Sequence, residues 1–489
     1  MQIDDEVTAA PPVTSRSRRT AVNAAVNFAA EVLGKGATFI WMVVATRVLA
    51  QEDFGALSYA LALGVLVSAL PGWGFDFAIV TRGSRNHRAL ERTYTETLVW
   101  QVGAALVVYG AAIGVEFSIR GATSTAVAFA LVLVSTAVDL FSHTMREAAV
   151  ARQRQAGMAG ALVVQRSVTA AAVVGTLLSG GGLLLAAVAI LTGSLVGLTM
   201  HFLALRRVGV RARPSSVSTA GLTELWRATL TTGVTGLVLV ALFRIDSVLL
   251  QLFLGERAVA AYAVSYRLVE TVLFVAWVLK DAVFPVMSAD DDATTTRRGL
   301  QLSSAAAAAV YLPFAAGAAV LAPQVIGLLY GERYIDQSAT ILVLLAPAPM
   351  LFALAYFLMA ALAARRLTSS MLISAGTALV VNVVLNLLLI PSLGGEGAAA
   401  TTTVSYLVEV LVAWMLLRRR IGAVHLVRAI WVAASASAVM VVALVVVRLP
   451  VLPEIVLGAV VYALAYAVVA RRWASEQLDL IATLIRRKM

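Results

Sequence analysis

The sequence contains no cysteine and few charged residues. None of the 489 residues is a cysteine, so neither a disulfide nor a thiolate metal site can form. Only 13% of the residues are charged, against about a quarter in soluble domains, while 60% are hydrophobic. The four histidines lack the spacing of a metal site, and no phosphate-binding Gly-Lys-Ser loop is present. We therefore expect a membrane protein that has no metal, no cofactor and no enzymatic activity.

Apolar runs recur along the whole chain. Each is about 20 residues long, which as a helix crosses a hydrocarbon core of roughly 30 Å. The pattern predicts an all-α integral membrane protein with about 14 transmembrane helices. The predicted spans are residues 22–48, 55–80, 95–115, 123–145, 157–178, 183–205, 225–252, 259–285, 299–322, 338–362, 370–390, 398–417, 428–447 and 454–470.

Positive charge alternates between the two sides of the predicted spans. The formal charge is +11, but arginine and lysine are spread over short loops rather than one patch, which argues against nucleic acid as a partner. One set of loops and termini carries 27 of these residues; the opposite set carries only Arg120, Arg257, Arg333 and Arg448. Because cytoplasmic loops collect arginine and lysine, we predict that both termini are cytoplasmic.

The chain divides into two similar halves. Segment 49–63 parallels segment 254–268, and segment 181–198 parallels segment 394–411, as in transporters built from internal repeats. Two six-helix lobes followed by two extra helices would result. The predicted parts are a cytoplasmic tail (1–21), an N-lobe (22–205), a cytoplasmic linker (206–224), a C-lobe (225–417), two further helices (428–470) and a cytoplasmic amphipathic tail that contacts membrane lipids (473–489).

Several segments together resemble a known family. They are FRIDSVLLQLFLGERAVAAYAVSYRLVETVLF (243–274), VFPVMS (283–288), APQVIGLLYGERY (322–334) and NVVLNLLLIPSLGGEGAAATTTVSYLVEVL (382–411). These segments resemble the Wzx-like polysaccharide or oligosaccharide flippases, whose superfamily, the multidrug/oligosaccharidyl-lipid/polysaccharide (MOP) exporters, also holds the lipid II flippases and the MATE-type drug exporters.

The resemblance implies both an architecture and a function. The two lobes would surround a central cavity that opens alternately to the two sides of a bacterial cytoplasmic membrane. An undecaprenyl-pyrophosphate-type lipid-linked oligosaccharide would pass from the inner to the outer leaflet, for surface polysaccharide biosynthesis. A polysaccharide polymerase and glycosyltransferases would then be functional partners.

Charged residues inside the predicted spans call for an explanation. An ionisable group at the centre of a membrane helix costs about 2.5 to 3.5 kcal/mol on insertion scales, unless water or a partner compensates it. Two of these residues, Arg244 and Arg267, lie about 16 and 18 Å from the turn at Gly255, and therefore at nearly the same depth. The in-span charges are Glu31, Lys35, Asp76, Asp139, Arg166, Arg227, Arg244, Asp246, Arg267, Glu270 and Glu409.

The in-span charges divide into two predicted roles. The cations would line a cavity that attracts the substrate pyrophosphate, which arginine binds in a bidentate manner; they are Lys35, Arg166, Arg244 and Arg267. The acids would either orient the arginines or couple transport to H⁺ or Na⁺; they are Glu31, Asp246, Glu270 and Glu409. Two pairs share a helix face, namely Glu31 with Lys35 and Arg267 with Glu270. The alternative to a role in the cavity is that each pair only neutralises itself locally.

Three alternative functions can be weighed against the sequence. A lipid II flippase is compatible with the same span count. A MATE-type exporter of cationic drugs would need an anionic or aromatic cavity, and the excess of basic candidates argues against one. A membrane polymerase or ligase of glycans would need a large outside loop, whereas the longest outside connections have only about ten residues.

Overall fold

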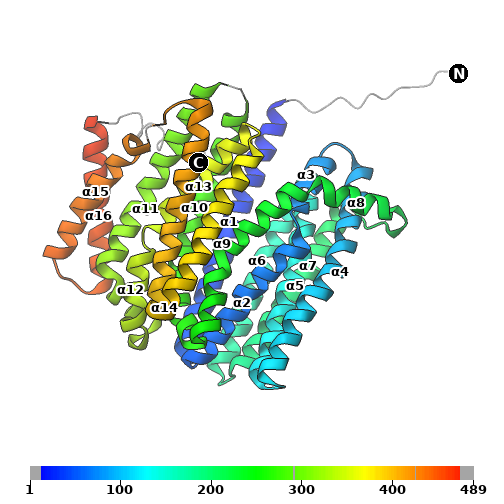
Figure 1. Ribbon diagram of the computed structural model, residues 1–489, viewed down its shortest axis with the longest axis horizontal. Coiled ribbons are helices and arrows are strands. Elements are labelled where there is room, and N and C mark those ends of the chain that lie inside the picture. The colour runs from blue at the N-terminus through cyan, green and yellow to red at the C-terminus, as the bar shows by residue number, and fades with distance from the viewer. Residues whose placement is uncertain (1–12, 290–291, 425, 474–489) are drawn as a thin grey trace.

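The structure is a computed structural model that describes residues 13–289, 292–424 and 426–473, and this part of the chain is helical without any strand (Figure 1). The first half contains α1 (Val13–Val48), α2 (Gln51–Gly72), α3 (Phe75–Gly83), α4 (His87–Arg120), α5 (Ser124–Ala151), α6 (Ala156–Leu178) and α7 (Leu183–Val208). The second half contains α8 (Thr219–Ala228), α9 (Leu230–Leu254), α10 (Glu256–Ala289), α11 (Ala293–Tyr330), α12 (Ile335–Leu345), α13 (Ala348–Ala364) and α14 (Thr368–Ile421), followed by α15 (Leu426–Val446) and α16 (Val451–Trp473). The predicted amphipathic tail lies, apart from its first residue, outside the described residues.

Thirteen candidate membrane spans are found in the described residues, and one of them is a hairpin. α14 has 54 residues, which as one straight helix would extend about 81 Å, far beyond a bilayer. Its backbone leaves the helical region at Gly394 (φ 59°, ψ −133°). Beyond this kink the chain runs back alongside the first part of α14. The hydrogen bond of 2.9 Å from the Ser374 hydroxyl to the Glu409 carbonyl joins the two parts. Counted as two passes, α14 completes the predicted fourteen.

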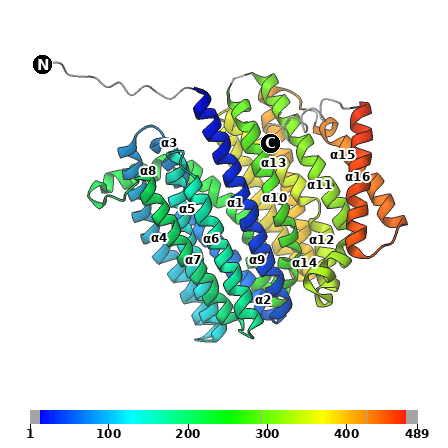
Figure 2. The same ribbon diagram turned by 180° about the vertical axis from the view of Figure 1, so that it is seen from behind.

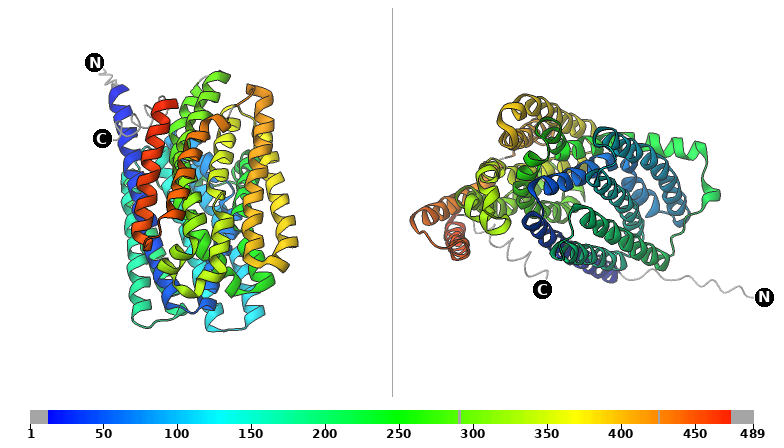
Figure 3. Two further views of the ribbon diagram at one scale, coloured as in Figure 1. Left: turned by 90° about the vertical axis from the view of Figure 1, so that its left-hand side faces the viewer. Right: turned by 90° about the horizontal axis from the view of Figure 1, so that it is seen from below.

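The helices form two lobes with two additional helices at the periphery. α2 to α7 lie on one side, with α1 packed against α6, and α9 to α14 lie on the other, as both faces of the molecule show (Figures 1 and 2). α15 and α16 pack against α11 at the outer edge of the second lobe (Figure 3). The predicted arrangement of two lobes plus two C-terminal helices is therefore confirmed.

Three predicted spans are interrupted in the structure. The span at 55–80 breaks after Pro71, where Trp73 and Gly74 adopt left-handed backbone angles before α3 begins. The span at 225–252 is divided at Thr229, and α8 therefore lies partly in the predicted linker. The span at 338–362 is divided before α13 at Pro347, which cannot donate a backbone hydrogen bond.

The two lobes make direct contacts at one end of the bundle, which we call the far end. It contains the α1–α2, α9–α10 and α11–α12 connections and lies opposite the basic end, where α1 begins (Figure 1). Arg47 in the last turn of α1 donates to the Leu328 and Leu329 carbonyls at the end of α11. In return, Arg333 donates to the Thr46 and Leu49 carbonyls at the end of α1. Each arginine thus satisfies carbonyls that the other lobe's helix leaves free.

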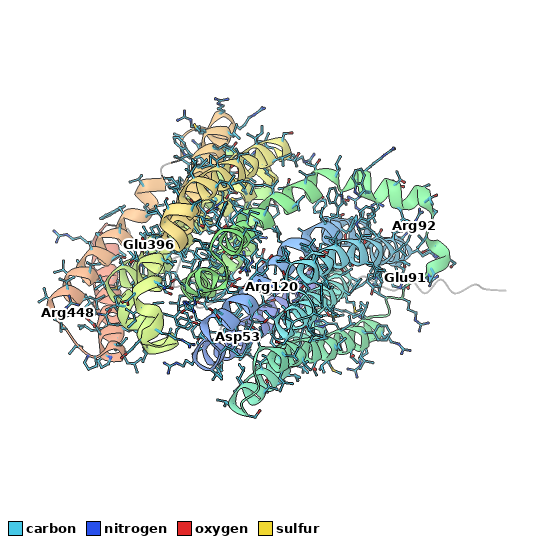
Figure 4. All side chains as sticks on the ribbon, turned by 60° about the horizontal axis from the view of Figure 1, so that its bottom comes forward. Asp53, Glu91, Arg92, Arg120, Glu396 and Arg448 are labelled. Carbon is cyan, nitrogen blue, oxygen red and sulfur yellow. The ribbon has the colours of Figure 1, made fainter. Side chains whose placement is uncertain are left out.

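Further contacts reinforce the far end. Arg120 at the end of α4 forms an ion pair with Glu256 at the start of α10, and Figure 4 shows Arg120 where the lobes meet. Gln51 donates to the Gln337 side chain over 3.2 Å. At Gly55 the helices α2 and α10 approach so closely that a Cβ atom would lie 1.9 Å from the Glu256 carbonyl oxygen. Glycine is therefore required at this crossing.

Replacing Gly55 by alanine should destabilise the protein. The added methyl group must push α2 away from α10, and such overpacking costs about 1 to 3 kcal/mol. Gly103 in α4 is the matched control, because a Cβ atom there would meet nothing within 4 Å. We expect Gly55→Ala to lower the thermal unfolding temperature in detergent, and Gly103→Ala to leave it unchanged or raise it. Equal effects of the two substitutions would contradict the close approach.

Candidate functional site

A pocket of about 280 Å³, here called the central pocket, lies between the lobes. Its walls come from α1, α2, α5 and α6 of the first lobe and from α9 and α10 of the second. Six of the eight residues predicted from the sequence line it: Glu31, Lys35, Arg166, Arg244, Arg267 and Glu270. The structure therefore gathers in-span charges from four helices around one space.

The most highly connected group in the central pocket is Glu270 on α10. Its Oε1 accepts a hydrogen bond of 2.7 Å from Arg244 Nη2 on α9, and its Oε2 accepts one of 2.7 Å from Arg267 Nη1. The predicted Arg267–Glu270 pair is thus present, and the two arginines lie at one level, as their depths indicated. One carboxylate pairs with two guanidinium groups, so this cluster keeps a net positive charge.

The arginines of this cluster retain capacity for further hydrogen bonds. Their side chains are only 15% exposed for Arg244 and 21% for Arg267. A guanidinium has five N–H donors, and the buried Nε of Arg244 has no partner among the described residues. Charged hydrogen bonds are roughly twice as strong as neutral ones in such surroundings. The cluster is therefore chemically suited to hold an oxyanion.

Lys35 reaches the same space from α1 of the other lobe. Its ammonium lies 4.8 Å from the ring centroid of Trp277 on α10, a cation–π contact between the lobes. The predicted local pair with Glu31 is wrong, because Glu31 instead forms an ion pair of 3.5 Å with Arg146 on α5. The ammonium of Lys35 thus forms no ion pair within the described part of the chain.

Arg166 completes the cationic lining from α6. Gly34 on α1 faces it, and a Cβ atom at Gly34 would lie 3.2 Å from Arg166 Cγ. This close approach of α1 and α6 brings the Arg166 side chain to the pocket wall. Arg166 forms no ion pair with any residue that the structure describes.

Asp246 and Glu409 do not line the central pocket. Asp246 is 1% exposed, and its Oδ2 accepts hydrogen bonds from the Tyr262 hydroxyl (2.6 Å) and the Thr402 hydroxyl (2.7 Å). Glu409 is 3% exposed and lines a separate apolar cavity within the second lobe, beside Lys280 and the aromatic side chains of α13. Neither acid forms an ion pair with the pocket arginines.

Asp139 and Gln165 were not predicted as site residues, although Asp139 was among the in-span charges. Asp139 on α5 lines the central pocket, and its Oδ1 accepts a 2.6 Å hydrogen bond from Gln165 Nε2 on α6. No spacing in the sequence connects these two residues, because they meet only through helix packing. Asn382 and Asn386 share one face of α14 and bond to each other, because Asn386 Nδ2 donates to Asn382 Oδ1 over 2.9 Å.

A second cavity of about 340 Å³, here called the vestibule, adjoins the central pocket on the side of the basic end. The two spaces share Glu31 and Leu162 in their walls. About half of the vestibule lining is polar, including His143, Arg146 and Glu147 of α5. In the described residues no group of three His, Asp or Glu side chains is arranged to hold a metal ion.

Comparisons with known structures identify the fold. A structure of the lipid II flippase MurJ in an inward closed conformation has a TM-score of 0.74 and 14% identity, covering 92% of this chain and 99% of that one. An inward-facing MATE-family multidrug resistance transporter has a TM-score of 0.67 and 15% identity, covering 82% and 98%. A MOP superfamily transporter from Pyrococcus furiosus, described as having a reversed polarity of its binding pocket, has a TM-score of 0.61 and 17% identity. The match covers 83% of this chain and 95% of that one.

Sequence comparison identifies the family. None of the curated proteins matches the chain. The sequence profile of the family described as "Polysaccharide biosynthesis protein" matches residues 21–289, which is more than half of the chain. With this match, the chain belongs to the polysaccharide biosynthesis protein family.

Proposed function

We propose that the protein is a flippase that moves an undecaprenyl-pyrophosphate-type lipid-linked oligosaccharide from the inner to the outer leaflet of a bacterial cytoplasmic membrane. The observation that carries this proposal is the Arg244–Glu270–Arg267 cluster inside a pocket between two lobes. The family match and the likeness to a lipid II flippase support a lipid-linked substrate.

The charges of the central pocket fit a pyrophosphate. Four cationic side chains line it, against the three acids Glu31, Asp139 and Glu270, so the lining is positive overall. A pyrophosphate that enters would compete with Glu270 for the two arginines and would gain bidentate hydrogen bonds in a partly desolvated space. Because Glu270 pairs with the arginines again after release, it keeps the empty site stable. Glu270 thus acts as an orienting acid.

The arrangement of contacts fits a pathway that begins on the cytoplasmic side. The strong excess of arginine at the basic end supports a cytoplasmic location for this end. The vestibule adjoins the central pocket in that direction, while the lobes are joined at the far end. A substrate would therefore enter from the inner leaflet, and release would require the far-end contacts to separate.

Two buried acids support coupling to H⁺ or Na⁺. Asp246 and Glu409 have no cationic partner among the described side chains, although charge at this depth is costly. Asp246 Oδ1 has no hydrogen-bond partner in the described structure. Protonation or a bound cation would satisfy such a group, and its release on one side of the membrane would drive the cycle.

Lipid II transport is the second candidate function, because its substrate has the same pyrophosphate linkage and the likeness to MurJ covers 92% of the chain. The glycan and the partner enzymes distinguish the two. For an exported polysaccharide, glycosyltransferases would supply the substrate and a polymerase would consume it.

Removing either pocket arginine should impair transport. Losing a charged hydrogen bond of about 1.5 to 3 kcal/mol corresponds to roughly a 10- to 100-fold loss. We expect Arg244→Gln and Arg267→Gln to reduce delivery of lipid-linked glycan to the outer leaflet by at least about tenfold. Arg85→Gln is the control, because Arg85 is exposed at the basic end. Normal transport in both pocket variants, with normal membrane insertion, would refute the cationic site.

Joining the lobes at the far end should stop transport reversibly. The chain has no native cysteine, so Gln51→Cys and Gln337→Cys introduce a unique pair at contacting positions. A short reducible thiol cross-linker should block transport by the double variant, and a reductant should restore it. Each single variant should be unaffected by the reagent. Full transport in the cross-linked protein would show that the far end does not open.

Coupling can be tested with proteoliposomes under imposed H⁺, Na⁺ or voltage gradients. We expect one ion gradient to accelerate transport by the parent protein. Either Asp246→Asn or Glu409→Gln should abolish that acceleration while residual transport continues, because the neutral amide no longer exchanges the ion. Indifference of the parent to all three gradients would contradict ion coupling.

A further inference from the structure

We infer that Asp139, positioned by Gln165, binds hydroxyl groups of the glycan in the transported lipid. This inference rests on the proposed function and assigns the sugar end of the substrate. The central pocket has been explained so far only by its cations, which hold the pyrophosphate. Asp139 is an acid in the same lining and forms no ion pair with them in the described structure.

One oxygen of the Asp139 carboxylate accepts a hydrogen bond from the protein, and the other is available to a ligand. Oδ1 accepts the 2.6 Å hydrogen bond from Gln165 Nε2, whereas no described residue donates to Oδ2. An ionised carboxylate has about four acceptor positions. Because Asp139 lines the pocket, donors for these positions must come from water or from a ligand. Sugar hydroxyls are such donors, whereas phosphate groups would be repelled by the negative charge.

Gln165 is held so that its amide must face Asp139. It is only 4% exposed, and Gly197 on α7 packs directly against it. A Cβ atom at Gly197 would lie 2.4 Å from Gln165 Cδ, so the amide fills the space that a larger residue would occupy. This packing fixes the Gln165 rotamer from behind, and the hydrogen bond in turn fixes the Asp139 carboxylate. Gln165 is therefore a positioning residue, and Asp139 is the residue that contacts the glycan.

Asp139 lies on the cytoplasmic side of the arginines, where the glycan of an entering substrate would be. Arg120, just before α5, pairs with Glu256 at the start of α10, so these helices begin at similar levels. At 1.5 Å per residue, Arg267 lies about 17 Å from that level and Asp139 about 23 Å. The offset of about 6 Å is comparable to the length of one sugar residue. A pyrophosphate on the arginines therefore brings the first sugar to Asp139.

The vestibule extends the same path for the rest of the glycan. It begins at Glu31, which lines both spaces, and its walls carry His143, Arg146 and Glu147. These polar groups suit a hydroxyl-rich chain better than a polyprenyl chain. The assignment thus gives the pocket two chemically distinct parts: an arginine part for phosphate and an Asp139 part for the first sugar.

The experiment compares two lipids binding to the purified protein in nanodiscs. The probes are polyprenyl pyrophosphate without sugar and the same lipid carrying a neutral disaccharide. The parent should bind the disaccharide lipid more tightly. Asp139→Asn should weaken binding of the disaccharide lipid by about tenfold, because a charged hydrogen bond to the glycan is lost. Binding of the sugar-free lipid should stay unchanged or become tighter, because a negative charge near the pyrophosphate is removed.

The companion variants separate this inference from the proposed function. Gln165→Leu keeps the Asp139 charge and should weaken only the disaccharide lipid, by a smaller factor, whereas Arg244→Gln should weaken both lipids. If the parent does not prefer the disaccharide lipid, or if Asp139→Asn alters both lipids equally or neither, the glycan role is wrong. If Arg244→Gln leaves both affinities unchanged, the pyrophosphate site is wrong, independently of Asp139. Unfolding temperatures of all variants identify any loss due to misfolding.

Discussion

The structure depends on the need to neutralise arginine at membrane depth. Arg244 and Arg267 come from two helices, and both donate to the single carboxylate of Glu270. If Glu270 were absent, two buried cations would face each other without compensation, a change that costs several kcal/mol in comparable sites. One carboxylate pairs with both guanidinium groups but neutralises only one of their two positive charges. The remaining positive charge makes the site receptive to an anion.

The proposed transport cycle imposes a second constraint: the lobes must stay together around this charged pocket and still be able to separate. The far end uses hydrogen bonds from Arg47 and Arg333 to helix-terminal carbonyls, which water can replace when the lobes part. Packing at Gly55 adds a close contact that tolerates no side chain. Reversible polar contacts and one tight crossing together suit an interface that opens and closes repeatedly.

The sequence predicted the architecture more completely than the site. Long apolar runs and alternating basic loops determined the spans, because the bilayer fixes helix length and charge fixes loop placement. The depths calculated from the turn at Gly255 correctly predicted that Arg244 and Arg267 lie at one level. Pairing along one helix face failed for Glu31, whose partner Arg146 is on another helix, and no sequence pattern revealed Gln165 behind Asp139. These contacts depend on helix rotation and packing, which hydropathy does not encode.

The central claim is that the two arginines bridged by Glu270 hold the substrate pyrophosphate. The most direct measurement is a cryo-electron microscopy structure of the protein in nanodiscs with polyprenyl pyrophosphate bound. The account predicts diphosphate density in contact with Arg244 and Arg267, with at least one of their hydrogen bonds to Glu270 replaced. Density for the diphosphate elsewhere, with the Arg244–Glu270–Arg267 cluster undisturbed, would contradict it.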